Sequence, residues 1–293
     1  MSSDPYDYSL SEPDKPAKAI DSGLYIVATP IGNLADMSHR AMEMLQAADL
    51  VAVEDSRVTG KLLHHLGLKK RMRPYHDHSS DADRDALLAV ARTGVVVLVS
   101  DAGTPLISDP GYKLVRAARE AGIAVSTAPG ASAVIAALSI SGLPTDRFLF
   151  AGFLPSRAKA RADAIAEIGN VKSTLVFYES GPRLGATLAA LSEQLGGRQA
   201  VVARELTKKF EEVVSGALPE LAERYAAVEP KGEIVLIVGP PGEAQVEQGD
   251  FEAALKAALE VLPPARAAKE IAKRFGVDRA EVYERAMALK SGA

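Results

Sequence analysis

Short runs of aliphatic and β-branched residues alternate with helical patterns from residue 23 onward, and this alternation restricts the chain to α/β architectures. Residues 24–28 and 50–53 have the composition of strands. Residues 95–99 are apolar at every position, which is typical of a strand buried on both faces of a sheet. The first half of the chain is therefore predicted to form a mostly parallel sheet covered by helices.

Helix boundaries in this half are predicted from capping residues. A helix over residues 59–66 is expected to end at Gly67. Asp109 followed by Pro110 predicts a helix that starts with a capping carboxylate and runs to about residue 121. Ser132 is expected to open a further helix after the Pro129-Gly130 turn.

The second half has a different pattern. Strands are predicted at 147–153, 173–179, 199–205, 210–216 and 232–238. The short spacing between the third and fourth indicates an antiparallel hairpin, and therefore a mixed sheet. The last 44 residues read as helices only. The predicted organisation is a disordered tail (1–21), an N-terminal α/β domain (22–140), a second α/β domain (141–242) and a small helical C-terminal extension (243–293).

Composition excludes several classes of protein. The formal net charge of −4 argues against a generally basic nucleic-acid binder. The absence of Cys rules out disulfides, thiolate chemistry and Cys-ligated zinc. The polar first 20 residues lack the features of a signal or transit peptide, and no apolar run approaches the roughly 20 residues that span a bilayer. We therefore expect a cytoplasmic protein without a membrane partner.

Familiar ligand motifs are missing. No G-x-G-x-x-G follows the first strand, and the P-loop, H-E-x-x-H and G-x-S-x-G patterns do not occur. His76 and His78 with Asp77 and Asp81 could ligate a metal, but such a cluster is more often a solvated loop, and we predict no metal site.

Small and polar residues follow each predicted strand of the first half, where ligands bind in open α/β sheets. The segments are TPIGNL from Thr29, EDSR from Glu54, SDAGTP from Ser100 and APGASA from Ala128. Loops of this kind form a narrow surface lined by backbone, which suits a flat adenine and a thioether chain. The alternative is that they are ordinary tight turns with capping residues.

Charged residues directly after the buried strand 50–53 are the candidate catalytic groups. Glu54, Asp55 and Arg57 would be costly to desolvate unless used or paired. The alternative is an ion pair of Arg57 with Asp55 or Glu54 that only caps the next helix.

Three basic clusters are candidate RNA contacts, although most charge runs are solvated surface. Aromatic residues make up 5% of the chain, which favours a folded RNA over a single-strand stacking platform. The clusters are Lys69, Lys70, Arg71 and Arg73; Arg157, Lys159 and Arg161; and Arg204, Lys208 and Lys209.

Five ordered segments carry a resemblance to a known family, ribosomal RNA small subunit methyltransferase I, which is related to the tetrapyrrole methylases. They are LYIVATPIGNLADMSHRAMEML, ADLVAVEDSRVTGKLL, VSDAGTPLISDPG, APGASAVIAALSISGLPTDRFLFAGFLP and ARELTKKFEE. The resemblance covers about residues 22–240 and extends to the helical tail. It implies the two-domain tetrapyrrole-methylase fold, with S-adenosylmethionine bound between the domains. It also implies a homodimer that methylates the 2′-oxygen of a cytidine in 16S rRNA within the 30S subunit.

The resemblance also implies donor-site residues. From the first half these are Pro30, Asp101, Gly103, Pro105, Ile107, Ser132 and Ala133. From the second half they are Tyr178, Arg204, Glu205, Leu206, Lys231, Gly232 and Glu233. The family usually has Y-E-S-P-H-R where this chain has Tyr178-Glu179-Ser180-Gly181-Pro182-Arg183, so no role of that His transfers.

Chemistry and rival functions stay open at this point. A ribose hydroxyl is a poor nucleophile, so a base or a cation near it would help. Glu54 and Asp55, with His76 behind them, are the candidate bases, and Arg57 and Lys231 are the candidate cations. The rivals are a corrin or porphyrinogen methyltransferase of the same fold and a non-catalytic ribosome assembly factor with a donor-like cleft.

Overall fold

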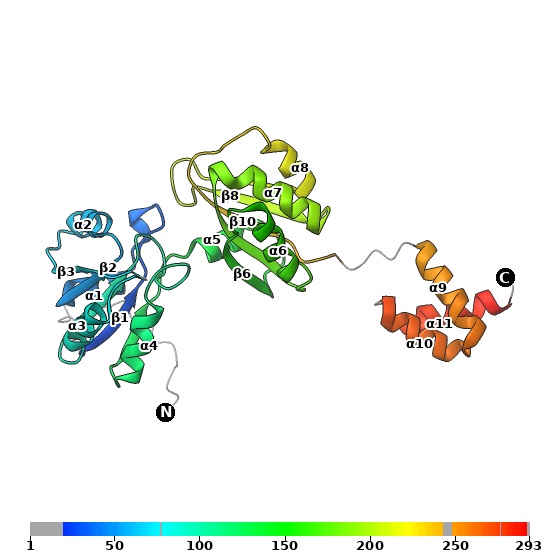
Figure 1. The fold of residues 1–293 in the computed structure, drawn as a ribbon, viewed down its shortest axis with the longest axis horizontal. Coiled ribbons are helices and arrows are strands. Elements are labelled where there is room, and N and C mark those ends of the chain that lie inside the picture. The colour runs from blue at the N-terminus through cyan, green and yellow to red at the C-terminus, as the bar shows by residue number, and fades with distance from the viewer. Residues whose placement is uncertain (1–19, 77, 243–247, 276, 292–293) are drawn as a thin grey trace, which may run out of the picture. The chain divides into compact units, whose positions relative to one another are not determined.

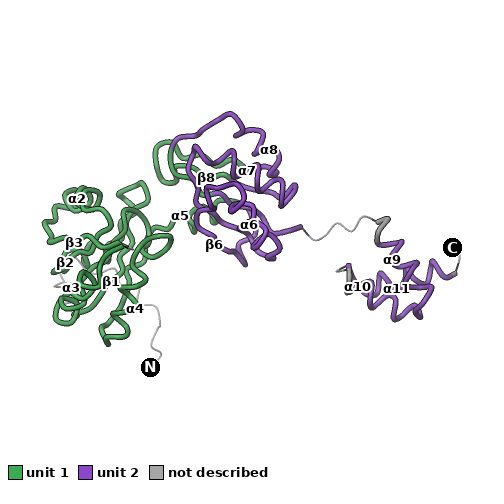
Figure 2. The backbone as a smooth tube through the Cα atoms, in the orientation of Figure 1, with its two compact units in different colours: residues 1–142, 202–214, 232–235 green, residues 143–201, 215–231, 236–293 purple. Residues whose placement is uncertain are grey.

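The computed structural model describes residues 20–76, 78–242, 248–275 and 277–291, drawn as a ribbon in Figure 1. Two compact units are distinguished in Figure 2. Unit 1 holds the described residues up to 142 together with 202–214 and 232–235, and unit 2 holds 143–201, 215–231 and the residues from 236 onward. Residues 1–19 of the predicted tail lie outside the described residues.

The sheet of unit 1 is parallel in every pairing, as predicted. Its strands are β1 (Gly23–Val27), β2 (Leu50–Val53), β3 (Met72–Pro74), β4 (Val95–Val99) and β5 (Val125–Ala128). They lie in the order β3-β2-β4-β1-β5, so β4 inserts between two strands that precede it in the chain. The carboxyl ends of these parallel strands therefore lie along one edge of the sheet.

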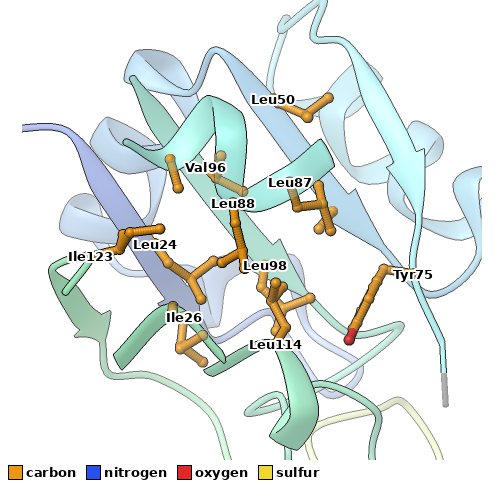
Figure 3. Close-up of a cluster of buried hydrophobic side chains, with 13 residues drawn as sticks. Leu24, Ile26, Leu50, Tyr75, Leu87, Leu88, Val96, Leu98, Leu114 and Ile123 are labelled. Atoms are coloured by element: carbon orange, nitrogen blue, oxygen red, sulfur yellow. The ribbon is translucent and has the colours of Figure 1, made fainter. Parts of the chain in front are cut away.

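Helices cover both faces of this sheet. Helices α1 (His39–Ala47) and α2 (Ser56–His65) pack on one face, and α3 (Asp81–Ala91) and α4 (Tyr112–Glu120) pack on the other. Alternate residues of β4 point to the two layers, with Val97 in the first and Leu98 in the second. Figure 3 shows the second layer, to which β4 contributes Val96 and Leu98. The fully apolar run over residues 95–99 is explained by this burial on both faces.

The predicted start of the helix after Asp109 is wrong. Helix α4 begins at Tyr112, and its N-cap is Gly111 with φ +134°, which makes no side-chain cap hydrogen bond. Leu106 and Ser108 also have positive φ, so the chain turns sharply before the helix starts. The Asp109 carboxyl is half-buried beside Ser100 and does not cap the helix.

Helix α2 starts three residues earlier than its apolar periodicity indicates. Asp55 is its N-cap and accepts a hydrogen bond from the backbone N of Arg57 at 2.8 Å. The predicted end is confirmed, since Leu66 is the C-cap and Gly67 follows with φ +71°. Helix α5 (Ala133–Ser141) follows Ser132, as predicted, although the Ser132 hydroxyl does not cap it.

The second sheet has the order β6-β7-β10-β8-β9. Its strands are β6 (Phe148–Phe153), β7 (Thr174–Ser180), β8 (Gln199–Arg204), β9 (Glu212–Ala217) and β10 (Glu233–Val238). Strands β6 and β7 are parallel. Strands β8 and β9 are neighbours joined by residues 205–211 only, which is too short for a parallel crossover. The sheet is therefore mixed, as predicted.

Three of the remaining helices lie between the strands of this sheet along the chain, and three more form the C-terminal extension. The first group is α6 (Ala158–Ile168), α7 (Gly181–Leu195) and α8 (Leu218–Arg224). Helices α9 (Gln248–Val261), α10 (Pro264–Phe275) and α11 (Arg279–Ser291) share a core of their own around Leu255, Ile271 and Val282. Asp278 caps α11 by accepting from the backbone N of Ala280 at 2.7 Å. None of the helices in the described part of the chain has the length and hydropathy needed to cross a bilayer.

Candidate functional site

The loops after β1 and β4 are joined at the carboxyl edge of the unit 1 sheet. Thr29 and Gly103 form an isolated bridge, with N···O distances of 2.9 and 3.0 Å in the two directions. The buried Thr29 hydroxyl also donates to the Ser100 carbonyl at 3.4 Å. Buried polar atoms with partners of this kind hold a loop rigidly. The predicted donor-site segments around Pro30 and Asp101 are therefore side by side.

The loop after β5 joins the same group. Thr104 donates through its hydroxyl to the Ala131 carbonyl at 3.1 Å. A Cβ on Gly130 would lie 2.9 Å from the Cβ of Ala28, so only glycine fits there. Gly103 has φ +76°, a conformation that side chains disfavour. The small residues that suggested a ligand surface are thus required for the loops to approach one another.

The loop after β2 contacts the loop after β4 through its acidic residues. The backbone N of Asp55 donates to Oδ1 of Asp101 at 3.1 Å, and the backbone N of Asp101 lies 3.5 Å from Oε2 of Glu54. Asp101 therefore holds the candidate catalytic segment in place. The carboxyl group of Glu54 lies at the same edge as the predicted donor loops.

Asp55 and Arg57 form the pair that the sequence allowed as a capping arrangement. The Arg57 guanidinium donates to both carboxylate oxygens of Asp55, at 3.0 and 3.1 Å through Nε and at 2.5 Å through one terminal nitrogen. These hydrogen bonds lower the pKa of Asp55 to about 2. A carboxylate with so low a proton affinity is a weak base at neutral pH. The geometry thus favours Glu54 over Asp55 as the base.

The predicted donor residues after β8 form an ion network within unit 1. The Lys208 ammonium donates to Glu205 at 2.9 Å and to Glu233 at 2.8 Å, and the backbone N of Glu233 donates to Glu205 at 3.1 Å. Gly232 has φ +102°, and a Cβ there would lie 2.4 Å from the Glu205 carboxylate. Glu205 and Thr207 also have positive φ, a strained arrangement that the network maintains.

Lys208 connects this network to the loop after β1. A Cβ on Gly32 would lie 2.4 Å from Cγ of Lys208 and 3.1 Å from the carbonyl oxygen of Leu206. The backbone at Gly32 therefore packs directly against the segment 206–208, although the two are far apart in sequence. Lys208 was assigned only to a basic cluster by the sequence, and its role in holding this loop could not be found from spacing.

The ion network predicts how stability changes with acid. The hydrogen bond from Lys208 lowers the pKa of Glu205 from its ordinary value of 4.5, so this carboxylate stabilises the folded protein above pH 4.5. The contribution is lost as pH falls below 4.5 through the lowered folded-state pKa. As pH falls below 4.5, the free energy of unfolding of Lys208→Met is expected to decrease less than that of the parent. Urea unfolding at each pH measures this. Lys209→Met, which removes an exposed charge, is the control, and equal pH dependence of Lys208→Met and the parent would contradict the assignment.

Asp109 is a further acidic group at this edge that the sequence assigned to helix capping. Burial raises the pKa of its carboxyl, a hydrogen bond with Ser100 opposes the rise, and the nearby Asp101 adds to it. Residues 108–111 have the sequence S-D-P-G, and the glycine adopts positive φ. This glycine was the one feature of the sequence that could have indicated a turn before the helix.

The other predicted donor residues are spread over both units. Pro105 is buried, Pro30, Ser132 and Ala133 are half-buried, and Ile107 is exposed, all in unit 1. Tyr178 and Lys231 belong to unit 2, and Arg204 pairs with Glu212 at 3.1 Å. Within the residues that the structure describes, no group of three or more His, Asp or Glu side chains could hold a metal ion. Asp77, which the sequence analysis considered as a metal ligand, is outside those residues.

The basic clusters differ in how much charge they present. Lys69 and Arg71 are exposed, whereas the Lys70 ammonium donates to the carbonyls of Gln46 and Ala48 at the end of α1. Arg157 and Lys159 are exposed at the start of α6, and the half-buried Arg161 lies 3.5 Å from the Ser156 carbonyl. The exposed members are the ones that an RNA phosphate can reach.

Comparison with known proteins identifies the class. A family model of the tetrapyrrole (corrin/porphyrin) methylases matches residues 23–222, and a model of the RsmI C-terminal HTH domain matches residues 245–290. Diphthine synthase is a structural neighbour with a TM-score of 0.58 and 17% identity, covering 74% of this chain and 89% of that one. Uroporphyrin-III C-methyltransferase from Thermus thermophilus has a TM-score of 0.51 and 24% identity, covering 74% and 93%. The fold is that of the tetrapyrrole methylases.

Curated relatives identify the family within that class. Ribosomal RNA small subunit methyltransferase I of Erythrobacter litoralis is 53% identical over 95% of this chain and 99% of that protein. The proteins of the same name from Mesorhizobium japonicum and Escherichia coli O157:H7 are each 46% identical, over 96% and 90% of this chain and 97% and 94% of their own lengths. The chain belongs to the ribosomal RNA small subunit methyltransferase I family.

Proposed function

We propose that this protein transfers the methyl group of S-adenosylmethionine to the 2′-oxygen of a cytidine ribose in 16S rRNA, acting on the 30S subunit. The observation that carries the proposal is the interlocking of the loops after β1, β2, β4 and β5 at one edge of the sheet. Family membership supplies the reaction class and the rRNA substrate.

The donor is held by the loops around Pro30, Gly103 and Ser132 together with the segment 204–206. Gly103 and Gly130 let these loops pack closely against one another, and the narrow surface of small residues that results fits a flat adenine and a thioether chain. Asp101 offers carboxylate oxygens from the centre of the group. When bound, S-adenosylmethionine supplies a methyl group already activated on sulfur. The protein's part is to align the acceptor oxygen with that group.

Glu54 accepts the proton of the ribose hydroxyl, and Asp55 caps α2. Glu54 is half-buried at the end of β2 and lies beside the backbone of Asp101, so its position is tied to the donor loops. Arg57 and Lys231 contact phosphates or the developing negative charge on the oxygen. Lys69, Arg71, Arg157 and Lys159 add phosphate contacts, with Lys70 and Arg161 supporting the backbone beside them.

A methylation assay tests the function. Purified protein with tritiated S-adenosylmethionine is expected to label 30S subunits from cells lacking this modification, and mass spectrometry of nucleosides is expected to show 2′-O-methylcytidine. Label on a porphyrinogen instead would support a tetrapyrrole methyltransferase. Calorimetry without detectable binding of S-adenosylmethionine would support an assembly factor.

We also propose that the protein is a cytoplasmic homodimer, as the resemblance described in the sequence analysis implies. Analytical ultracentrifugation at micromolar concentration tests the oligomeric state. Sedimentation at about twice the mass of the 30.9 kDa chain is the expected result, and a single monomeric species contradicts it.

A further inference from the structure

An irregularity in β6 places two phenylalanines on the same face of the second sheet. The register between β6 and β7 pairs Phe150 with Val176 and Phe153 with Tyr178, and it shifts between Phe150 and Gly152. Gly152, with φ +65°, supplies the conformation that this bulge requires. In a regular strand Phe150 and Phe153 would point to opposite faces, because they are three residues apart. The bulge therefore turns Phe153 toward the side of Tyr178.

The result is a cluster of aromatic rings within unit 2, formed by Phe150, Phe153 and Tyr178. The Phe150 and Tyr178 ring centroids are 4.8 Å apart in an edge arrangement, and those of Phe153 and Tyr178 are 5.6 Å apart. Phe153 is nevertheless 57% exposed, at the carboxyl end of its strand (β6 in Figure 1). A ring held from one side and open on the other is suited to stacking with a flat partner.

Basic residues lie close to this exposed ring along the chain. Arg157 follows four residues later, within about 14 Å along the chain, and it is exposed together with Lys159. The Arg183 guanidinium donates to the carbonyl of Leu154, next to Phe153, and forms an ion pair with Glu179 at 3.2 Å. No acidic residue lies in the first turn of α6. An aromatic face next to exposed cations matches a nucleobase whose chain carries phosphates.

We propose that Phe153 stacks on a nucleobase of the acceptor RNA and so contributes to the binding of that RNA. The inference rests on the proposed function, since the RNA that it binds is the substrate of that reaction. A nucleobase could also come from the adenine of S-adenosylmethionine. The neighbouring cations favour RNA, because the donor carries no phosphate.

The first test is steady-state methylation of 30S subunits that lack the modification. Phe153→Ala and Phe153→Leu are expected to raise KM for the subunits about tenfold, whereas Phe153→Tyr and Phe153→Trp stay within about threefold of the parent. Phe148→Ala is the matched control, because Phe148 is also exposed, at 42%, at the opposite end of the same strand. Full activity of Phe153→Leu would overturn the proposal, since Leu keeps the apolar surface without the ring.

The second test separates the two sources of nucleobase. The chain has no Trp, so Phe153→Trp places a single fluorophore at the site. Saturating S-adenosylhomocysteine is expected to leave its emission unchanged, and calorimetry is expected to show the parent affinity for S-adenosylmethionine in Phe153→Ala. Quenching by S-adenosylhomocysteine, or a loss of donor affinity, would assign the ring to the donor. Failure of the parent itself to methylate the subunits would instead reject the proposed function.

Discussion

Glu54→Gln is expected to slow single-turnover methyl transfer by about 100-fold or more while leaving the affinity for S-adenosylmethionine unchanged. The substitution keeps the shape of the side chain and its ability to accept from the backbone N of Asp101, at 3.5 Å in the parent. It removes the capacity to take a proton. Rapid-quench measurement with saturating 30S subunits isolates the chemical step, and calorimetry measures donor binding.

Asp55→Asn is the matched control for this prediction. Asn caps helices about as well as Asp, so the start of α2 is retained while the charge paired with Arg57 is lost. Because the Arg57 hydrogen bonds hold the pKa of Asp55 at about 2, this carboxylate contributes little as a base. We expect single-turnover rates within a few-fold of the parent. If Asp55→Asn is as slow as Glu54→Gln, or Glu54→Gln is fully active, the assignment of the base is wrong.

Gly181→Ala is expected to destabilise unit 2 by about 2–4 kcal/mol, the largest stability effect among the substitutions considered. A Cβ at this position would lie 1.6 Å from the carbonyl oxygen of Pro230, where real atoms cannot approach. Both partners are backbone, so relief requires the start of α7 or the segment around Pro230 to move. Thermal and urea unfolding of the full chain measure the loss.

Gly197→Ala is the control, in the same unit and just after α7. Nothing lies within 4 Å of a Cβ built on Gly197, so the change is expected to alter stability by less than about 0.5 kcal/mol. Comparable stability of the two variants would show that the Gly181 contact is readily relieved. The contact also bears on the departure from the Y-E-S-P-H-R pattern, since glycine is the residue that fits against Pro230 here.

Local sequence patterns were sufficient to predict most helices and strands, because the positions of apolar residues indicate which side chains are buried. The apolar runs that became β2 and β4 are buried at every position, and Gly67 ended α2 where its missing side chain allows positive φ. The start of α4 was mispredicted because Asp followed by Pro is a common pattern at the start of a helix. Its carboxyl lies beside Ser100 instead, a residue of another segment that local pattern does not include.

The clustering of the candidate site at one edge also followed from sequence, since small and polar residues come directly after buried strands. Their actual partners did not. Asp101 meets Asp55 across 46 residues because β4 inserts beside β2, and strand order is not encoded in the periodicity of either strand. Likewise, a count of basic residues could not show that Lys70 and Lys208 are held by carbonyls and carboxylates whereas Arg157 is exposed.

The sequence by itself determined the α/β class, the strands and the chemistry available at their ends, because desolvation acts on each segment separately. Only the tertiary structure decided which of those groups touch. In the folded protein Lys208 packs against Gly32, and Asp55 pairs with Arg57 beside Asp101. A one-residue bulge turns Phe153 toward Tyr178. Register and strand order depend on the packing of the whole unit, which no local window of sequence contains.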